Sequence, residues 1–292
     1  MERAQQSKSQ KSCCLVGKFS ALHRGHRKLI EEAKKRCSDV KLVTVKRGEQ
    51  LFSGEEREEL LKELRVESVE LPFEHIKELS PEEFLKLLKE MGCSVLVVGK
   101  EWRFGKGRSG TAETAKKLGR KLGIEVVTVE PVKEGESKIS TSEIVKLLRE
   151  GSIEEANRLL GFNYFTVGTV ERGKGLGRRL GFPTLNVKVK ELPLPYGVYA
   201  VNLVIEGRKL PAVANYGVRP TVERDSKPVL EVHVPKAHLP QLYGKRVRVE
   251  FLKFLRPEKR FSTVEELKNQ IKLDLKKFQT VLEERVGREQ EV

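Results

Sequence analysis

The sequence GTVERGKGLGRRLGFPTLN, residues 168–186, begins in one predicted strand and ends at the start of another. Gly173, Gly175 and Gly177 are spaced by two, and Lys174 lies between the first two of them. Such a loop turns backbone N–H groups towards phosphate oxygens with no side chain in the way, and the lysine adds positive charge. The pattern predicts a phosphate-binding loop, and a plain hairpin is the alternative that the glycines alone leave open.

Pro183-Thr184-Leu185-Asn186 follows this loop at once. On a strand, the hydroxyl of Thr184 and the amide of Asn186 point to the same face, because side chains two residues apart do so. Oxygen atoms of this kind suit a hard cation such as Mg²⁺, so we expect both residues to be metal ligands. The alternative is that they cap a turn.

Glu231 is an acid among apolar residues in the predicted strand 229–234, VLEVHV. A carboxylate in such a place is a candidate general base that takes a proton from a substrate hydroxyl. The alternative interpretation is a strand residue that faces solvent.

The region around these motifs contains predicted strands and turns. The strands are expected at residues 165–171, 198–205, 209–214, 229–234 and 246–255. Strands of this length and spacing predict a small antiparallel β-barrel. One long helix follows, capped by Ser262 with Glu265, and its apolar stripe predicts that it lies against the barrel. The stripe consists of Val264, Leu267, Ile271, Leu275, Phe278, Leu282 and Val286.

The first half of the chain alternates strands with helices. Strands are expected at residues 13–17, 41–45, 95–98 and 126–129, and helices at 27–36, 54–64, 80–91 and 112–122. Helix 80–91 has the clearest ends, because Ser80 and Glu83 form a capping box, Pro81 takes the first position and Gly92 follows the last turn. This alternation predicts a Rossmann-like α/β domain, a parallel sheet with helices on both faces.

Two further predicted helices, 142–149 and 153–160, separate the two patterns. The second begins with a capping box of Ser152 and Glu155 and stops at Gly161. We therefore predict an α/β domain at residues 12–161 and a β-barrel domain with a terminal helix at 162–287, with polar tails at 1–11 and 288–292.

The composition argues against other classes of protein. The net charge is +15, but lysine and arginine alternate with glutamate nearly throughout, so a nucleic-acid-binding surface is not expected. The four cysteines include no C-x-x-C pair, which predicts neither a zinc site nor a disulfide framework and fits a reducing compartment. No apolar segment suits a signal peptide or a membrane span, so we expect a soluble cytoplasmic protein. Nothing in the sequence indicates the oligomeric state.

Residues 17–26, GKFSALHRGH, follow the first predicted strand and open a helix. His23 and His26 flank Gly25 there, where unpaired N–H groups and the helix dipole favour an anion. The chain has only five histidines, and two of them lie here. The pattern predicts a site for nucleotide phosphates, and a chance pair at an ordinary helix start is the alternative.

The C-terminal motifs together resemble the riboflavin kinase family, whose motif G-F-P-T-A-N matches residues 181–186 with leucine for alanine. The resemblance continues through residues 197–200, 215–221, 242–245 and 254–256 and the helix after Phe261. It implies a six-stranded Greek-key barrel that phosphorylates riboflavin to FMN with ATP. It also implies that Thr184 and Asn186 hold Mg²⁺·ATP and that Glu231 activates the terminal ribityl hydroxyl.

The N-terminal motifs resemble the nucleotidylyltransferase superfamily, and their order and spacing resemble the FMN adenylyltransferase domain of prokaryotic bifunctional FAD synthetases. Besides residues 17–26, the segments 99–110 and 139–144 match. The resemblance implies transfer of AMP from ATP to FMN, with His23 and His26 stabilising the leaving pyrophosphate. The implied nucleotide contacts are Gly17, Phe19, Gly25, Ser140, Thr141 and Ser142, and the implied flavin contacts, over both domains, are Arg103, Phe104 and Arg219.

The N-terminal motifs also depart from the family. Residues 20–22, SAL, replace D-G-V, Glu101 replaces an aspartate or asparagine, and Val145 replaces an arginine that would face triphosphate. Arg149, one helical turn after Val145, is a candidate replacement. Three hypotheses follow: a bifunctional enzyme that makes FMN and FAD, a riboflavin kinase with a degenerate N-terminal domain, and a basic nucleic-acid-binding protein on the same scaffold.

Overall fold

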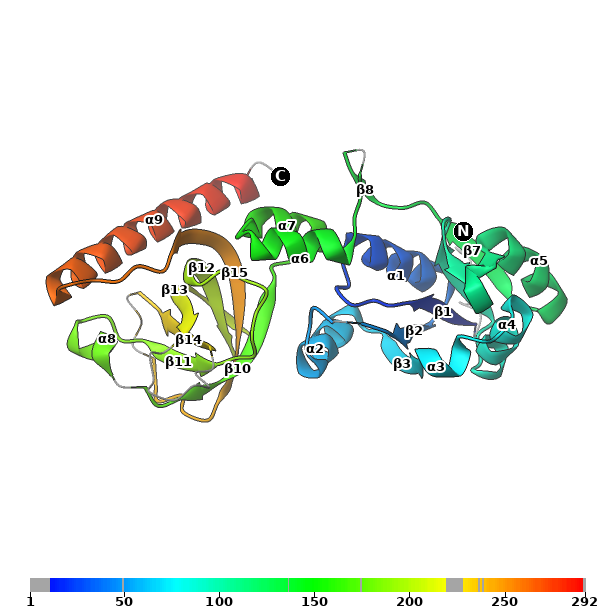
Figure 1. The fold of residues 1–292 in the computed structure, drawn as a ribbon, viewed down its shortest axis with the longest axis horizontal. Helices are drawn as coiled ribbons and strands as arrows, with labels where there is room; N and C mark the ends of the chain where they lie inside the picture. Colours follow the sequence, from blue (N-terminus) through cyan, green and yellow to red (C-terminus); the bar gives the residue numbers. More distant parts are fainter. Residues whose placement is uncertain are drawn as a thin grey trace, which may run out of the picture. The chain divides into compact units, whose positions relative to one another are not determined.

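The computed structural model describes residues 11–290 except 49, 136, 174, 219–227, 236 and 238. The chain divides into two compact units, Met1–Thr141 and Ser142–Val292 (Figure 1). By this division, almost all of α6 (Thr141–Arg149) and all of α7 (Ile153–Leu160) fall in the second unit. The functional domain boundary near residue 161 stays a prediction.

The first unit is built on a sheet of five strands in the order β3-β2-β1-β4-β7, and all neighbouring strands are parallel. The strands are β1 (Ser12–Gly17), β2 (Asp39–Lys46), β3 (Glu67–Pro72), β4 (Val95–Gly99) and β7 (Glu125–Val129). β1 lies at the centre and is buried on both faces, as expected of a parallel strand between helices. The predicted parallel α/β fold is confirmed. Strand β3 was not predicted, because it is an edge strand whose residues are mostly exposed.

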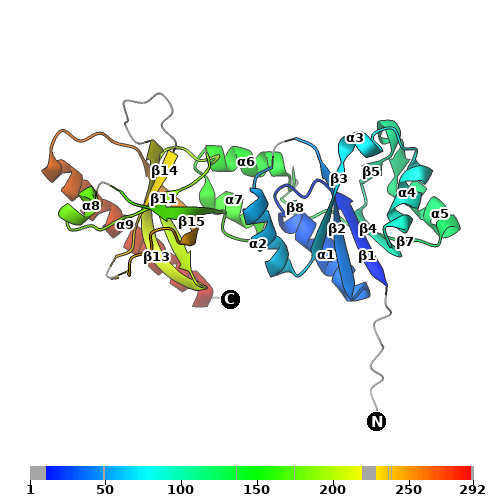
Figure 2. The ribbon, with the colours of Figure 1, turned by 90° about the horizontal axis from the view of Figure 1, so that it is seen from below.

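Helices cover both faces of this sheet. α1 (Arg24–Arg36) packs on one face, while α3 (Phe73–Ile76), α4 (Pro81–Glu90) and α5 (Ala112–Leu122) share a core with β1 and β4 on the other (Figure 2). α2 (Gly54–Leu64) follows β2. The predicted capping box of Ser80 and Glu83 is present at the start of α4.

All four cysteines form disulfide bonds, so the expectation of no disulfide framework is wrong. Cys13 and Cys14 are neighbours in β1, and their side chains therefore point to opposite faces of the sheet. Cys13 is bonded to Cys37 after α1, and Cys14 is bonded to Cys93 before β4. The four residues are buried. Spacing rules miss this arrangement because each pair is distant in the sequence and meets only in the folded sheet.

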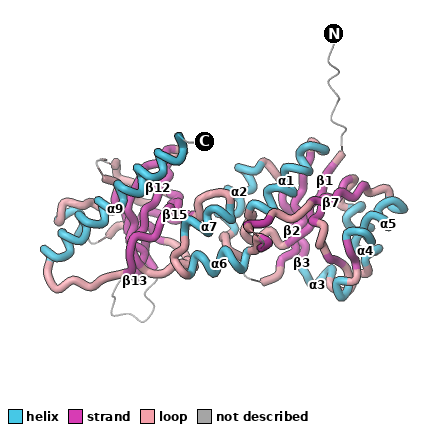
Figure 3. The backbone as a smooth tube through the Cα atoms, turned by 90° about the horizontal axis from the view of Figure 1, so that it is seen from above, coloured by secondary structure: helices cyan, strands magenta, loops and turns pink. Residues whose placement is uncertain are grey.

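The second unit contains a closed barrel of six strands in the order β10-β11-β14-β13-β12-β15 (Figure 3). The strands are β10 (Phe165–Glu171), β11 (Leu185–Lys188), β12 (Gly197–Ile205), β13 (Arg208–Val218), β14 (Pro228–His233) and β15 (Arg246–Pro257). All neighbours are antiparallel, and β11–β14 and β12–β15 pair across long connections, as in a Greek key. The predicted barrel is confirmed.

The terminal helix α9 (Val264–Gln290) packs on the barrel along part of its predicted stripe. Phe278 and Val281 are buried in a cluster with residues of β12 and β15. Val264 and Val286, at the two ends of the stripe, are exposed. Within the described ranges, no helix is both long enough and apolar enough to cross a membrane.

Two predicted capping boxes differ from the structure, although Ser152 is the N-cap residue of α7 as expected. At α9, Oγ1 of Thr263 accepts a hydrogen bond from the N–H of Glu266 (3.2 Å), so the cap lies one residue later than the predicted Ser262 with Glu265. At α7, the side chain of Ser152 makes no capping hydrogen bond to any residue that the structure describes. Adjacent hydroxyl residues such as Ser262 and Thr263 leave the position of a cap ambiguous in sequence, and only the geometry decides it.

Candidate active sites

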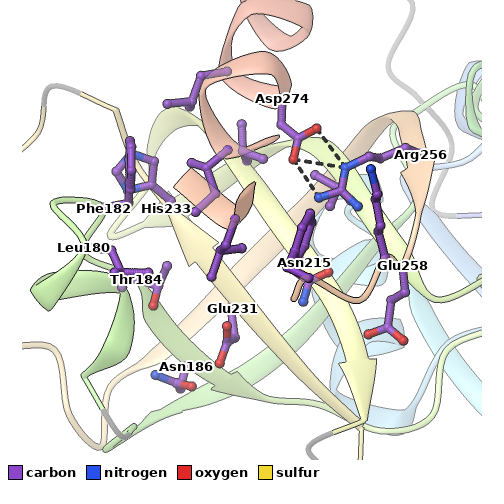
Figure 4. A pocket seen from close by; sticks show the side chains of 18 of the residues that line it. Leu180, Phe182, Thr184, Asn186, Asn215, Glu231, His233, Arg256, Glu258 and Asp274 are labelled. Carbon is purple, nitrogen blue, oxygen red and sulfur yellow. Dashed lines mark hydrogen bonds and ion pairs between the residues drawn. The ribbon is translucent and has the colours of Figure 1, made fainter. Parts of the chain in front are cut away.

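A row of side chains crosses the barrel wall of the second unit. In the strand register, Asn186 of β11 lies opposite Glu231 of β14, and Glu231 lies opposite Asn215 of β13. Asn215 lies opposite Val198 of β12, which in turn lies opposite Arg256 of β15. Residues that are directly opposite in antiparallel strands point to the same face, so these five side chains share one face of the barrel wall. Figure 4 shows the four polar ones around a pocket.

This pocket has a volume of about 400 Å³. One end holds Thr184, Asn186 and Glu231, and much of the remaining wall is apolar (Figure 4). The apolar residues come from the barrel, from the loop before β11, from the segment between β15 and α9 and from the first half of α9; they are Leu180, Phe182, Val198, Val213, Phe261, Leu267, Ile271 and Leu275. A pocket of this kind suits a flat aromatic ligand with a polar tail that reaches Glu231.

The glycine loop sits directly on Thr184 and Asn186. A Cβ atom on Gly173 would lie 2.0 Å from Nδ2 of Asn186, and a Cβ atom on Gly177 would lie 3.1 Å from Oγ1 of Thr184. Gly175 has a φ of +69°, in the left-handed region that favours glycine. Glycine is therefore required at all three positions, at two of them by close packing and at one by the backbone.

A second pocket, of about 640 Å³, shares Gly175, Thr184 and Asn186 with the first. Its wall adds Gly173 and also Arg178, which belongs to the short helix α8 (Leu176–Arg179). Ligands in the two pockets would therefore meet at Thr184 and Asn186, next to Glu231. Two other predicted ligand-binding residues, Lys174 and Arg219, lie outside the described residues.

The oxygen atoms of Thr184 and Asn186 fit a magnesium ion. Mg²⁺ prefers oxygen ligands and usually keeps several coordination positions for water and substrate phosphates. In the part of the chain that the structure describes, no group of three His, Cys, Asp or Glu side chains could hold a metal ion. Thr184 and Asn186 contribute one hydroxyl and one amide, which suits a cation that arrives with a nucleotide.

Arg256, at the end of the row, was not predicted as a site residue. Its Nε and Nη2 each donate a hydrogen bond of 2.8 Å to the carboxylate of Asp274 in α9. Nε2 of Gln270 donates to the same carboxylate at 3.0 Å. Asp274 is only 4% exposed. An aspartate beside Leu275 in the apolar stripe of α9 is the sequence signal that indicates a buried partner.

In the first unit, His23 and His26 lie at the start of α1. His23 is the N-cap, and its Nδ1 accepts a hydrogen bond of 3.2 Å from the N–H of Gly25. The two imidazole rings stack with centroids 3.8 Å apart, and the ring of Phe19 packs edge-on against His26 at 5.0 Å. Gly17 ends β1 next to the Phe19 ring. The structure thus brings five of the predicted residues together.

Both imidazoles are neutral at pH 7. Burial, with a smaller effect of the positive charge of Lys138, lowers the pKa of His23 to about 4. Burial, with smaller effects of His23, Arg57 and Lys138, lowers the pKa of His26 well below its usual value. A neutral imidazole that accepts a hydrogen bond at Nδ1 carries its proton on Nε2, so His23 presents Nε2–H to a ligand.

Two contacts involve side chains of the three N-terminal motifs. Oγ of Ser20 and Oγ1 of Thr141 are 3.2 Å apart, which joins the first motif to the third. Nζ of Lys138 lies 2.9 Å from the carboxylate of Glu101 in the second motif. Lys138 was not predicted as a site residue, although it directly precedes the third motif in the sequence.

The remaining predicted residues of these motifs differ in exposure. Ser140 is exposed, and Ser142 lies in the first turn of α6. Arg103 is exposed on β5 (Arg103–Phe104). Phe104 is buried in the core, where its ring stacks on Trp102 with centroids 4.2 Å apart. A contact between Phe104 and flavin therefore stays a prediction.

A parallel α/β unit with paired histidines at a helix start, followed by a barrel with a glycine loop and a Thr–Asn–Glu cluster, defines a two-domain transferase that uses nucleotides. A FAD synthetase family model matches residues 5–143, and a riboflavin kinase family model matches residues 160–282. The bifunctional riboflavin kinase/FMN adenylyltransferase of Escherichia coli (strain K12) is 33% identical over 287 residues, covering 91% of each chain. That of Listeria monocytogenes is 31% identical, covering 89% of this chain and 88% of its own. The chain belongs to this bifunctional family.

A solved structure supports the fold over both units. It is described as a macrolide-efflux protein from Streptococcus pneumoniae, and it is 28% identical with a TM-score of 0.80. The match covers 92% of this chain and 93% of that chain. The similarity concerns the fold, and efflux is said of that protein alone.

Proposed function

We propose that the second unit phosphorylates riboflavin to FMN with ATP. The observation that carries this proposal is the direct pairing of Asn186 with Glu231 where two pockets meet. The apolar pocket suits the isoalloxazine ring, and its polar end would receive the ribityl chain. The second pocket, lined by the glycine loop, would hold the phosphates of ATP.

In this reaction Glu231 would take the proton of the terminal ribityl hydroxyl while the oxygen attacks the γ-phosphorus and ADP leaves. Backbone N–H groups around Gly173, Gly175 and Gly177, with the charge of Lys174, would stabilise the phosphate oxygens. Orientation and charge compensation are what phosphoryl transfer needs most, and these groups supply both.

Thr184 and Asn186 would hold Mg²⁺, which when bound neutralises charge on the transferred phosphoryl group. Arg219 would contact the flavin. With these residues, the substrates of the second unit are riboflavin and ATP.

We further propose that the first unit transfers AMP from ATP to FMN. An FMN phosphate oxygen would attack the α-phosphorus, and the bond to pyrophosphate would break. His23 and His26 would donate hydrogen bonds to the leaving phosphates as neutral imidazoles, together with the N–H groups at the start of α1. Lys138 would supply the charge that Val145 lacks, because it lies close enough to lower the pKa of both histidines.

The other contacts proposed for the first unit follow the three motifs. Ser140, Thr141 and Ser142 would bind phosphate oxygens of ATP. Gly17, Phe19 and Gly25 would line the nucleotide, and Arg103 and Phe104 would contribute to the flavin side.

A riboflavin kinase with an inactive first unit is the second candidate. It is favoured by Glu101, whose carboxylate holds Lys138 at 2.9 Å and would repel a triphosphate. The half-buried Val145 adds no charge. No feature of the described residues favours nucleic-acid binding over these two candidates.

A product assay tests both activities in one chain. The protein is incubated with riboflavin, ATP and Mg²⁺, flavins are separated by chromatography over time, and a parallel reaction starts from FMN. We expect FMN and then FAD in the first reaction, and FAD in the second. Accumulation of FMN with no FAD in either reaction would support the second candidate. Unchanged riboflavin, in a buffer where a known riboflavin kinase works, would overturn the proposal.

We also propose domain limits of 12–161 and 162–287 for these two functions, and the cytoplasm as their location. Disulfide bonds are compatible with this location, because intracellular proteins of hyperthermophiles are often rich in them. The charged fraction of 34% is typical of such proteins.

A further inference from the structure

Arg256 and Glu231 lie at opposite ends of the same pocket wall. Strands β13 and β12 separate them, so three strand spacings, about 14 Å along the wall, lie between the two residues. Both residues line the apolar pocket, and Figure 4 shows Asn215 between them. A ligand with a hydroxyl near Glu231 would therefore extend its other end towards Arg256.

The guanidinium of Arg256 is held in one orientation. Nε and Nη2 donate to Asp274 at 2.8 Å each, and Nη1 donates to the backbone oxygen of Pro257 at 2.9 Å. Arginine has five N–H donors. Within the described residues, these bonds leave one N–H on each terminal nitrogen for a ligand.

This ion pair is largely buried, with exposed side-chain fractions of 15% for Arg256 and 5% for Asp274. A buried ion pair is weak evidence for a role in stability, because loss of hydration offsets the attraction between the charges. The helix α9 already has an apolar anchor on the barrel in Phe278 and Val281. A recognition role therefore explains a fixed cation in the pocket wall better than a stabilising role does.

Lys253, on the same strand as Arg256, forms an ion pair with α9 that lies outside the pocket. Its Nζ also reaches α9, at 3.4 Å from the carboxylate of Glu284. The lysine side chain is 33% exposed and the glutamate 45%, and neither residue is among those that line the pocket. One β15–α9 ion pair is thus on the outside, and the other faces the ligand space.

We infer that Arg256 is a specificity-determining residue whose guanidinium donates hydrogen bonds to the carbonyl oxygens on the pyrimidine edge of the flavin ring. The inference rests on the proposed riboflavin kinase function and deepens it. The isoalloxazine ring has one apolar edge and one edge with two carbonyl acceptors, and a guanidinium held by a carboxylate is a preorganised donor for the second. Phe261, whose ring centroid lies 5.9 Å from Cζ of Arg256, lines the pocket beside it.

Flavin binding without ATP tests this inference on the full chain. Riboflavin fluorescence is titrated with the wild type, Arg256→Met, Arg256→Lys and the matched control Lys253→Met. We expect the Kd for riboflavin to rise roughly tenfold in Arg256→Met and by less in Arg256→Lys, because lysine keeps the positive charge but lacks the paired N–H donors of the guanidinium. Lys253→Met should bind as the wild type does. Wild-type riboflavin affinity in both Arg256 variants would overturn the inference.

Two analogues separate recognition from structure. In 2-thioriboflavin and 4-thioriboflavin, sulfur replaces one carbonyl oxygen and accepts hydrogen bonds poorly. We expect the wild type to bind one of them several-fold more weakly than riboflavin, and Arg256→Met to bind both like riboflavin. The inference would be overturned if the wild type and Arg256→Met showed the same ratio of affinities for riboflavin and each thio analogue. Should Arg256→Met fail to fold, Arg256→Lys carries the same comparison.

Steady-state kinetics also distinguish a recognition role of Arg256 from a purely structural role. For the Arg256 variants we expect a higher KM for riboflavin with nearly unchanged kcat and KM for ATP, whereas a purely structural role would change all three together and lower the unfolding temperature. A wild-type protein that binds riboflavin but does not phosphorylate it would overturn the proposed function, while the binding titration would still decide the role of Arg256.

Discussion

Asn186 and Glu231 lie directly opposite each other in the antiparallel pair of β11 and β14. Their side chains share one face of the barrel, so a phosphate group held at Asn186 would lie next to a hydroxyl held at Glu231. The two residues belong to segments separated by β12 and β13 in the sequence, and the strand register alone brings them together. Substitution of either Asn186 or Glu231 should therefore change the rate of phosphoryl transfer, while the other residue still binds its own substrate.

Glu231→Gln keeps the shape of the site and removes the proposed base. We expect kcat for FMN formation to fall by about 10²- to 10⁴-fold, with little change in KM for ATP. FAD formation from FMN by the first unit should stay at the wild-type rate and serves as the control in the same tube. Steady-state kinetics of both reactions check this, and a fall of less than about tenfold would show that another group takes the proton.

Gly173→Ala should damage the proposed phosphate-binding loop. The new Cβ would lie 2.0 Å from the amide of Asn186, so either the loop or the amide must move. We expect the KM for ATP in FMN formation to rise at least about tenfold, because the N–H groups of the loop are displaced from the phosphates. Gly287→Ala in α9 is the matched control, because no described atom lies within 4 Å of its new Cβ. Equal kinetics of the two variants would contradict the assignment of the loop.

Much of the second unit could be predicted from the sequence because its signals are local. Thr184 and Asn186 are two residues apart, so the strand period alone places both on one face. The alternation of short strands and turns predicted the barrel, and in the first unit Ser80 with Glu83 predicted the start of α4.

Several of the features that were missed depend on contacts between distant segments. Cys14 and Cys93 are separated by 79 residues, and no spacing rule relates them. Arg256 meets Asp274 only because α9 returns over β15, and Lys138 meets Glu101 only in the folded sheet unit. Strand register and helix docking decide such pairs, and both are properties of the whole fold.

His23 should make the first unit less stable in acid. Its folded-state pKa of about 4 lies below the usual 6.5, so between these values the unfolded chain binds a proton that the folded chain does not. Stability is therefore present above about pH 6.5 and falls as the pH falls towards 4. At pH 5 the loss of unfolding free energy is on the order of 2 kcal/mol. The pKa of His26 is lowered too, which acts in the same direction.

The single tryptophan, Trp102, lies in the first unit, so its fluorescence reports denaturant unfolding there. We expect His23→Gln to lose less stability than the wild type between pH 7 and pH 5. His75→Gln, at an exposed position in α3, is the control and should keep the wild-type pH dependence. The same slope in all three proteins would mean that His23 does not titrate as its burial requires.

The two disulfide bonds should stabilise the first unit and leave the second unchanged. They tie the central strand β1 to segments on both faces of the sheet, across sequence separations of 24 and 79 residues. Each such bond contributes about 2–4 kcal/mol by restricting the unfolded chain. After unfolding, reduction and refolding in a reductant, we expect Trp102 fluorescence to report a transition at clearly lower denaturant concentration, and FMN formation to persist. An unchanged Trp102 transition in protein whose four thiols are shown to be free would mean that packing alone holds β1 in place.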